Sequence, residues 1–144
     1  MGQSIPKKTE RKWNAIKKKF INFTNHPSDR WDEEQKKAAL EYGEIIDIPF
    51  PSVSPQGDES YIDRLAGQYV EQILSLYPCA VLCQGEFCLA YQVITKLREK
   101  GIKVLAACSE RIVKEAGQRK EVIFVFGQFR EYGTTGQVQA GGNQ

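Results

Sequence analysis

Three groups of polar residues stand where an apolar segment of the chain ends, and these groups are the first candidates for chemistry. They occupy residues 25–28 (Asn-His-Pro-Ser), 84–87 (Gln-Gly-Glu-Phe) and 108–111 (Cys-Ser-Glu-Arg), while a fourth junction at 49–51 (Pro-Phe-Pro) is apolar. The preceding segments have the composition of β-strands, and in open α/β sheets ligands bind outside the carboxyl ends of the strands. We therefore expect these sequence-distant groups to converge on one site.

Two of the junctions have groups suited to binding an anion. Gly85 would let a ligand approach the backbone where a strand becomes a helix, and the Ser109 hydroxyl with the Arg111 guanidinium would hold a phosphate. A structural interpretation is also open for each. Gly85 would then only make the turn, Glu86 would complement the helix dipole, and Ser109 would be a helix N-cap.

His26 is the only histidine of the chain. Histidine exchanges protons near neutral pH, so His26 is a candidate general acid or base, although a loop histidine beside a proline is more often structural. The sequence has neither a dinucleotide-binding fingerprint nor a P-loop, so neither NAD binding nor ATP hydrolysis is indicated. The four cysteines lack zinc-site spacing. We expect no metal and no cofactor.

Aromatic residues accompany the polar groups. Trp31, Phe50 and Phe87 fall near the predicted strand ends, where aromatic rings can stack on nucleic-acid bases or pack in a lid or a dimer interface. Phe129 and Tyr132 follow the last predicted strand, and their spacing indicates that they close the core or an interface.

The elements that must position these residues alternate between strand and helix. Strands are predicted at 19–24, 44–50, 79–83, 102–107 and 121–126. Helices are predicted at 30–42, capped by Ser28 or Asp29, and at 59–77, 86–100 and 110–117. This alternation predicts an α/β fold, a Rossmann-like three-layer sandwich with a mostly parallel sheet of about five strands and helices on both faces. The alternative is a mixed sheet whose fifth strand runs antiparallel at an edge.

Length and charge set the class of protein. The 144 residues suffice for one domain, predicted at 19–132, between a basic N-terminal extension at 1–18 and a disordered tail at 133–144. Residues 1–19 carry a net charge of +6 and the remainder −4, so the body lacks the basic face of a duplex-DNA reader. No segment approaches the roughly 20 apolar residues of a membrane span, and no secretory leader is evident. We expect a cytoplasmic protein that does not contact membranes.

Three segments together resemble a known family. Residues 20–27 (Phe-Ile-Asn-Phe-Thr-Asn-His-Pro), 84–87 and 107–111 (Ala-Cys-Ser-Glu-Arg) look like the small stand-alone CRISPR-associated Rossmann-fold (CARF-like) proteins of type III systems, some of which are ring nucleases. The resemblance covers about residues 19–132. It implies a homodimer that binds a cyclic oligoadenylate across its two-fold axis. It also implies metal-independent cleavage, in which a ribose 2′-hydroxyl attacks the adjacent phosphate.

The resemblance also implies roles for particular residues. The implied catalytic set handles the proton and the developing charge: His26, Glu86, Ser109 and Arg111. The implied ligand-binding set holds phosphates and adenine edges: Asn25, Ser28, Gln84, Gly85, Phe87, Ser109 and Arg111. Asn25 and Gln84 would read the adenine edges.

Two other functions fit the same residues. A nucleoside or nucleotide enzyme of the glycosyl-transfer type would use Glu86 as its nucleophile at the same strand end. A non-enzymatic interaction module would use the polar groups only as helix caps and turns.

Overall fold

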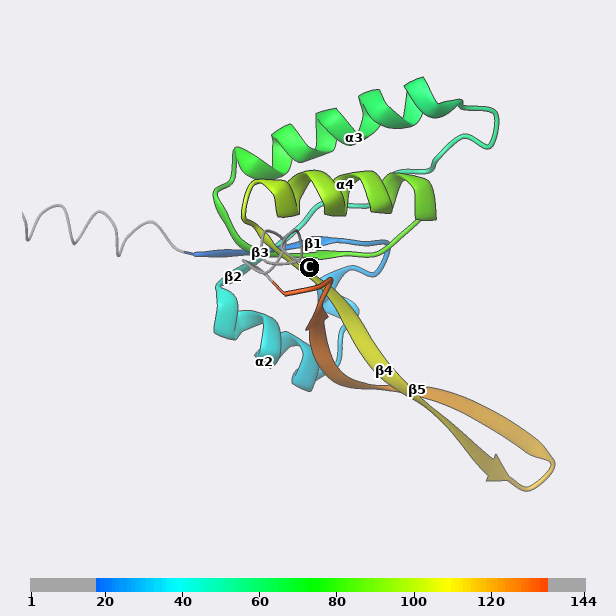
Figure 1. Cartoon of the computed structure of the whole chain (residues 1–144). Helices are drawn as coiled ribbons and strands as arrows, with labels where there is room; N and C mark the ends of the chain where they lie inside the picture. The colour runs from blue at the N-terminus through cyan, green and yellow to red at the C-terminus, as the bar shows by residue number, and fades with distance from the viewer. Residues whose placement is uncertain (1–17, 135–144) are drawn as a thin grey trace, which may run out of the picture.

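The computed structural model describes residues 18–134, and within that range the chain forms an α/β fold with a five-stranded mixed sheet and three α-helices (Figure 1). The strands are β1 (Lys19–Phe23), β2 (Glu44–Asp47), β3 (Pro78–Cys83), β4 (Lys103–Ala116) and β5 (Arg119–Glu131). The helices are α2 (Glu33–Tyr42), α3 (Glu59–Leu74) and α4 (Phe87–Glu99), with a 3-10 turn, η1, at Ser28–Arg30. The predicted N-terminal extension and disordered tail lie outside the described residues, apart from positions 18, 133 and 134.

The sheet has the strand order β2-β1-β3-β4-β5. β1 pairs in parallel with β2 on one side and with β3 on the other, and β3 pairs in parallel with β4. β4 and β5 pair antiparallel. The α/β class is therefore confirmed, but the prediction of a mostly parallel sheet is wrong, because the long last strand folds back beside its predecessor. The mixed sheet with an antiparallel edge strand, the alternative drawn from the sequence, describes the fold.

Each face of the sheet carries its own buried cluster. On one face Ile21, Phe23, Val81 and Val104 pack beneath residues of α3 and α4 such as Val93. On the other face Phe20, Leu82 and Leu105 pack with Trp31 and with Ala39 of α2. Alternate residues of β1 and β3 thus point to opposite faces, and both faces are covered (Figure 1). The apolar runs of these strands are continuous for this reason.

The predicted helix at 110–117 is wrong, and its residues form the end of β4. β4 continues to Ala116, and β5 begins at Arg119, so only Gly117 and Gln118 connect them. Gly117 has a φ of 68°, and Gln118 has no positive φ, which is the pattern of a two-residue type II′ hairpin turn. β3 pairs with β4 only as far as Leu105. The rest of the hairpin therefore extends away from the helices (Figure 1).

The helix boundaries follow their caps. α2 begins three residues later than predicted, because the Oδ1 atom of Asp32, rather than a side chain of Ser28 or Asp29, accepts the N–H of Gln35 at 2.9 Å.

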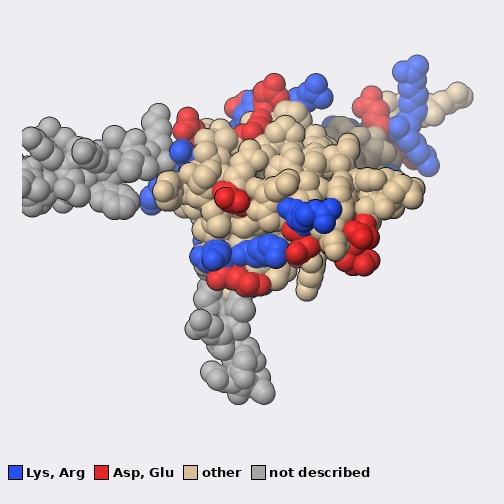
Figure 2. All heavy atoms as spheres, turned by 90° about the horizontal axis from the view of Figure 1, so that it is seen from above, with Lys and Arg blue, Asp and Glu red and all other residues tan. Residues whose placement is uncertain are grey.

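Within residues 18–134, none of the helices is both long and apolar enough to cross a membrane. Seen from above, acidic and basic side chains are interspersed, without a large patch of one sign (Figure 2).

Candidate functional site

The carboxyl ends of β1 and β3, the middle of β4 and the neighbouring part of β5 line a pocket of about 720 Å³. Its floor includes Leu82 at the end of β3 and Ala107 of β4, while Phe124 and Phe126 of β5 stand on its hairpin side. β1 lies at the point where the connections diverge, since α2 covers one face of the sheet and α4 the other. Open α/β sheets bind ligands at such a divergence. The sequence-based expectation that strand-end groups converge is met by Asn25, His26, Gln84 and Ser109, which all line this pocket.

The loop that carries Asn25 and His26 is held by a buried amide. Asn22, which is 1% exposed, donates from Nδ2 to the carbonyl of His26 at 2.9 Å and to Oδ1 of Asp47 at 3.0 Å. Its Oδ1 accepts the hydroxyl of Thr24 at 2.8 Å. Asp47 in turn accepts both the N–H and the hydroxyl of Ser28 at 3.1 Å. These hydrogen bonds hold the loop backbone at the His26 carbonyl and at the Ser28 N–H. They are expected to persist, because buried polar groups keep their hydrogen-bond partners.

Gln84 joins β3 to β4 beyond the end of their ladder. Its Oε1 atom accepts the N–H of Ala107 at 2.7 Å, two residues after the last paired residue, Leu105. Within residues 18–134 the Nε2 group of Gln84 makes no hydrogen bond, so it can donate to a ligand in the pocket. The Oε1 atom of Gln84 thus has a structural role, while its Nε2 group can contact a molecule in the pocket.

A β-bulge turns the hairpin over the pocket. The pairing of β4 with β5 shifts between Cys108 and Ser109, so that Ser109 pairs with Phe126 and Arg111 pairs with Phe124. Directly opposite residues of an antiparallel pair point to the same face, so Arg111 shares the pocket face of the ribbon with Phe124. Arg111 itself is exposed and lies beyond the pocket-lining residues.

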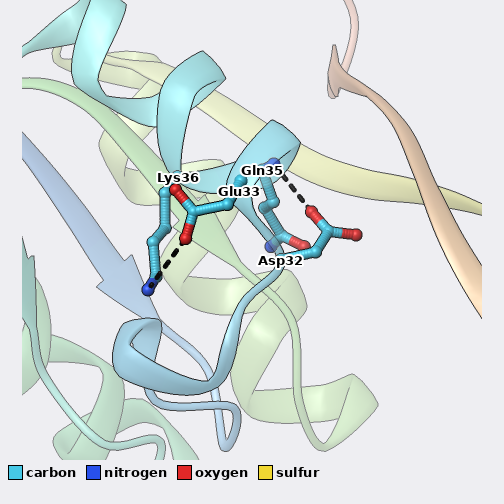
Figure 3. A network of polar contacts seen from close by, with 4 residues as sticks. All are labelled: Asp32, Glu33, Gln35 and Lys36. Atoms are coloured by element: carbon cyan, nitrogen blue, oxygen red, sulfur yellow. Dashed lines mark hydrogen bonds and ion pairs between the residues drawn. The ribbon is translucent and has the colours of Figure 1, made fainter.

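Arginines supply the positive charge near the pocket, because a carboxylate already caps the helix N-terminus at α2 and at α4. Asp32 caps α2, beside an ion pair of 3.9 Å between Lys36 and Glu33 on the first turn of the helix (Figure 3). At the N-terminus of α4, Oε1 of Glu86 accepts the N–H of Leu89 at 2.7 Å. A carboxylate at a helix N-terminus occupies the amide that a phosphate would use. The positive charge near the pocket therefore comes from Arg30, which lines it, and from Arg111.

Five residues of the predicted ligand-binding and catalytic sets lie outside this pocket: Ser28, Gly85, Glu86, Phe87 and Arg111. Glu86 is the N-cap of α4. Gly85 packs so closely on Phe50 that a Cβ atom there would lie 2.5 Å from three ring atoms. Phe87 is 89% exposed and lines two shallower hollows on the α4 side of the sheet, and Ser28 binds Asp47 behind the loop. The turn and cap interpretations thus account for Gly85 and Glu86.

A protein-family model described as "Uncharacterized protein MJ1673 family" matches residues 18–130, which include every strand-end group of the pocket. The chain belongs to the MJ1673 family. The searches of curated proteins and of solved structures find no match. The matched range of the MJ1673-family domain extends through nearly all of β5, so the hairpin is part of the family's common segment.

Sequence reasoning missed the aromatic side of the pocket in this MJ1673-family domain. Phe124 and Phe126 alternate in sequence and would have been placed on one face of a strand, but the predicted helix at 110–117 hid the hairpin that brings them over the pocket. Trp31 lines the pocket as the sequence suggested, and its Nε1 group donates to the carbonyl of His26 at 3.1 Å. Phe50, in contrast, is buried against Phe23, with ring centroids 4.8 Å apart.

Cys83 and Cys108 lie near the pocket but do not line it. Burial raises the pKa of the Cys83 thiol to about 12. The hydroxyl of Tyr132 donates to the carbonyl of Cys83 at 2.9 Å, and burial, followed by the neighbouring thiols of Cys83 and Cys108, raises the pKa of Tyr132. The described residues contain no group of three or more His, Cys, Asp or Glu side chains arranged to hold a metal ion.

Proposed function

We propose that the strand-end pocket binds a nucleotide ligand of the cyclic oligoadenylate class, in a CRISPR-associated role. The proposal is carried by the composition of this one pocket, which joins the amides of Asn25 and Gln84, the guanidinium of Arg30, and the rings of Phe124 and Phe126. Aromatic rings stack on bases, amides pair with adenine edges, and a guanidinium binds phosphate oxygens in a bidentate manner. These are the three contacts that a phosphodiester-linked adenine nucleotide needs.

The resemblance to CARF-like proteins supports the same ligand. We propose that the domain is of the Rossmann-like three-layer class, since β2, β1, β3 and β4 are parallel and helices cover both faces of the sheet. In this class the divergence beside β1 is the expected ligand site. Asn25, His26, Gln84 and Ser109 are the residues that the resemblance and the pocket share.

The size of the pocket bears on the oligomeric state. About 720 Å³ is within the range of ordinary small-molecule sites, so one pocket would hold part of a ring of four or six nucleotides. We propose that the protein acts as a homodimer in which two pockets hold one two-fold symmetric ring.

Cleavage of the ring is a second candidate activity, favoured by the presence of His26 and Ser109 in the same pocket. A ribose 2′-oxygen would attack the adjacent phosphorus, and the bond from phosphorus to the 5′-oxygen would break. The 2′-hydroxyl proton would pass to His26 or to water, and the leaving 5′-oxygen would take up a proton. The products would be a 2′,3′-cyclic phosphate end and a 5′-hydroxyl end. Among residues 18–134, no hydrogen bond orients the His26 imidazole. We therefore expect the ring to be bound but cleaved slowly.

Glycosyl transfer is less well supported. Its nucleophile would be Glu86, and that carboxylate caps α4 and does not line the pocket. A non-enzymatic interaction module remains the outcome if no nucleotide binds.

The test is a calorimetric titration of the full chain with cyclic tetra-adenylate and cyclic hexa-adenylate, followed by separation of the products after incubation with a chelator. Arg30→Ala and Gln84→Ala are expected to weaken binding, whereas Phe87→Ala, an exposed aromatic residue outside the pocket, should leave the affinity unchanged. Equal affinities in all three variants would place the site elsewhere. A released adenine base would favour glycosyl transfer instead.

A further inference from the structure

β5 is an edge strand that contains a run of apolar residues. It ends the strand order of the sheet, so over residues 18–134 its backbone pairs only with β4. Residues 122–126 of β5 (Val-Ile-Phe-Val-Phe) are five consecutive β-forming apolar residues without a proline or a charge. Natural proteins blunt such edges with charges, prolines or bulges, because a bare apolar edge pairs with another strand.

The same residues are exposed on both faces of the hairpin. Phe124 is 66% exposed, Val122 is 45% and Val125 is 42%. Beyond Leu105 the hairpin is a two-stranded ribbon that extends from the body (Figure 1). A ribbon of this kind is marginally stable in water unless a further strand or a packed face supports it.

We infer that the outer edge of β5 pairs antiparallel with β5 of a second copy of this chain, about a two-fold axis at Phe124. In this register Phe124 lies opposite the partner's Phe124, and Ile123 lies opposite the partner's Val125. Val122 lies opposite the partner's Phe126. The apolar run is thus its own complement, because each of its five residues meets an apolar residue.

The charges that flank the run fit the same register. Within residues 120–128, Lys120 falls opposite the partner's Gln128 and Glu121 falls opposite the partner's Gly127, so no like charges meet there. Moving the axis to Ile123 would place Lys120 against the partner's Phe126 and Glu121 against the partner's Val125. Pairing about a two-fold axis uses the outer β5 edge of both copies and gives a closed dimer. A strand of a different protein added to β5 would instead present its own unpaired edge.

Pairing through β5 does not depend on nucleotide binding. The two nevertheless fit together. A two-fold axis perpendicular to the sheet keeps corresponding faces on the same side, so both pockets would open on one face of the joined sheet, whose central part would be β4 and β5 of each copy. Phe124, which lines the pocket, would then lie beside the axis.

The test measures the mass of the full chain in solution, without nucleotide, by sedimentation velocity and light scattering. The unsubstituted protein is expected to be a dimer. Ile123→Lys and Val125→Glu, which both alter the ribbon face away from the pocket, should each weaken dimerisation at least tenfold. An equimolar mixture of the two variants should restore a heterodimer, because the introduced lysine lies opposite the introduced glutamate while the other Ile–Val contact is kept.

The cross-strand neighbours Val113 and Val122 provide a matched control. Both valines are 45% exposed and share one face of the ribbon. Each strand of the ribbon has one unpaired edge beyond Leu105, but only Val122 belongs to the apolar run of residues 122–126. Val122→Lys should give a monomer and Val113→Lys a dimer, with unchanged far-ultraviolet circular dichroism in both. A monomeric unsubstituted protein, open-ended growth, a failed rescue by mixing, or equal effects of the two valine variants would each overturn the inference.

Discussion

The side-chain amide of Asn22 donates to Oδ1 of Asp47 at 3.0 Å and so links neighbouring strands, 25 positions apart in sequence, directly beneath the loop that lines the pocket. The same amide holds the carbonyl of His26, and Asp47 holds the backbone of Ser28. The loop is therefore shaped by buried polar contacts on the sheet side. The side chains of Asn25 and His26 take no part in these contacts.

Asn22→Ala is expected to destabilise the protein by about 1–3 kcal/mol, because it removes a buried hydrogen bond from the hydroxyl of Thr24 and another from the carbonyl of His26, which keeps its bond from Nε1 of Trp31. It should also weaken ligand binding, although Asn22 does not line the pocket. Urea unfolding measures the first effect and calorimetry the second. Ser28→Ala, which removes only an exposed bond to Asp47, should cost no more than about 0.5 kcal/mol. Equal losses in the two variants would argue against a supporting role for Asn22.

Gly85→Ala is expected to destabilise the fold by about 1–3 kcal/mol, because the added methyl group meets the ring of Phe50. The matched control is Gly67→Ala in the middle of α3, where a Cβ atom meets nothing within 4 Å. That change should stabilise the protein by about 0.5–1 kcal/mol through helix propensity. Thermal unfolding of both variants measures the difference. A neutral Gly85→Ala would mean that Phe50 yields freely.

Arg111→Ala should weaken binding of cyclic tetra-adenylate about tenfold, roughly 1.4 kcal/mol, if its guanidinium contacts a phosphate from the pocket face of the hairpin. Ser109→Ala should act in the same direction with a smaller effect. Arg119→Ala serves as the control, since Arg119 lies near the hairpin turn and on the opposite face of the ribbon. Calorimetry compares the three variants at constant salt. An equal effect of Arg119→Ala would indicate a non-specific charge effect.

Cys83 should resist alkylation in the folded protein, while Cys79 and Cys88 react. The thiolate is the reactive form, and burial raises the pKa of Cys83 to about 12, so at pH 8 its thiol remains protonated as well as inaccessible. Cys79 and Cys88 are exposed. Treatment with iodoacetamide followed by peptide mass spectrometry measures each rate. Labelling of Cys83 at the rate of Cys79 would contradict its burial.

The body of the fold could be predicted from the sequence because its patterns are local. The continuous apolar run before Cys83 indicated a strand covered on both faces, and β3 is such a strand. The end of α2 was placed by Gly43, whose φ of 158° and close approach to the backbone of Lys18 exclude a side chain. The periodicity of α3 and α4 gave their positions to within three residues at each end.

The hairpin could not be predicted because its signals conflict. Glu, Lys and Ala favour a helix over 110–117, and Ser109 and Gly117 stand where a helix cap and a helix end would be. The β-branched residues Ile112 and Val113, matched by Val122 and Ile123 across a Gly-Gln turn, point instead to paired strands. Cross-strand pairing decided the outcome, and with it the aromatic side of the pocket.

The role of Glu86 also could not be predicted from its residue type alone. Glu86 follows β3 as a nucleophile or acid would, but its carboxylate reaches the first turn of α4 instead. Only the direction of the side chain separates a cap from a reactive group, and sequence spacing does not fix that direction.

The most direct test of the central claim is photo-crosslinking of the full chain to cyclic tetra-adenylate carrying a photoreactive adenine, followed by peptide mapping. The pocket predicts saturable labelling of the peptides that contain Asn25 or His26 and Phe124 or Phe126, with competition by the unmodified ring. Saturable labelling confined to other peptides, or no labelling that the unmodified ring displaces, would contradict the proposed site.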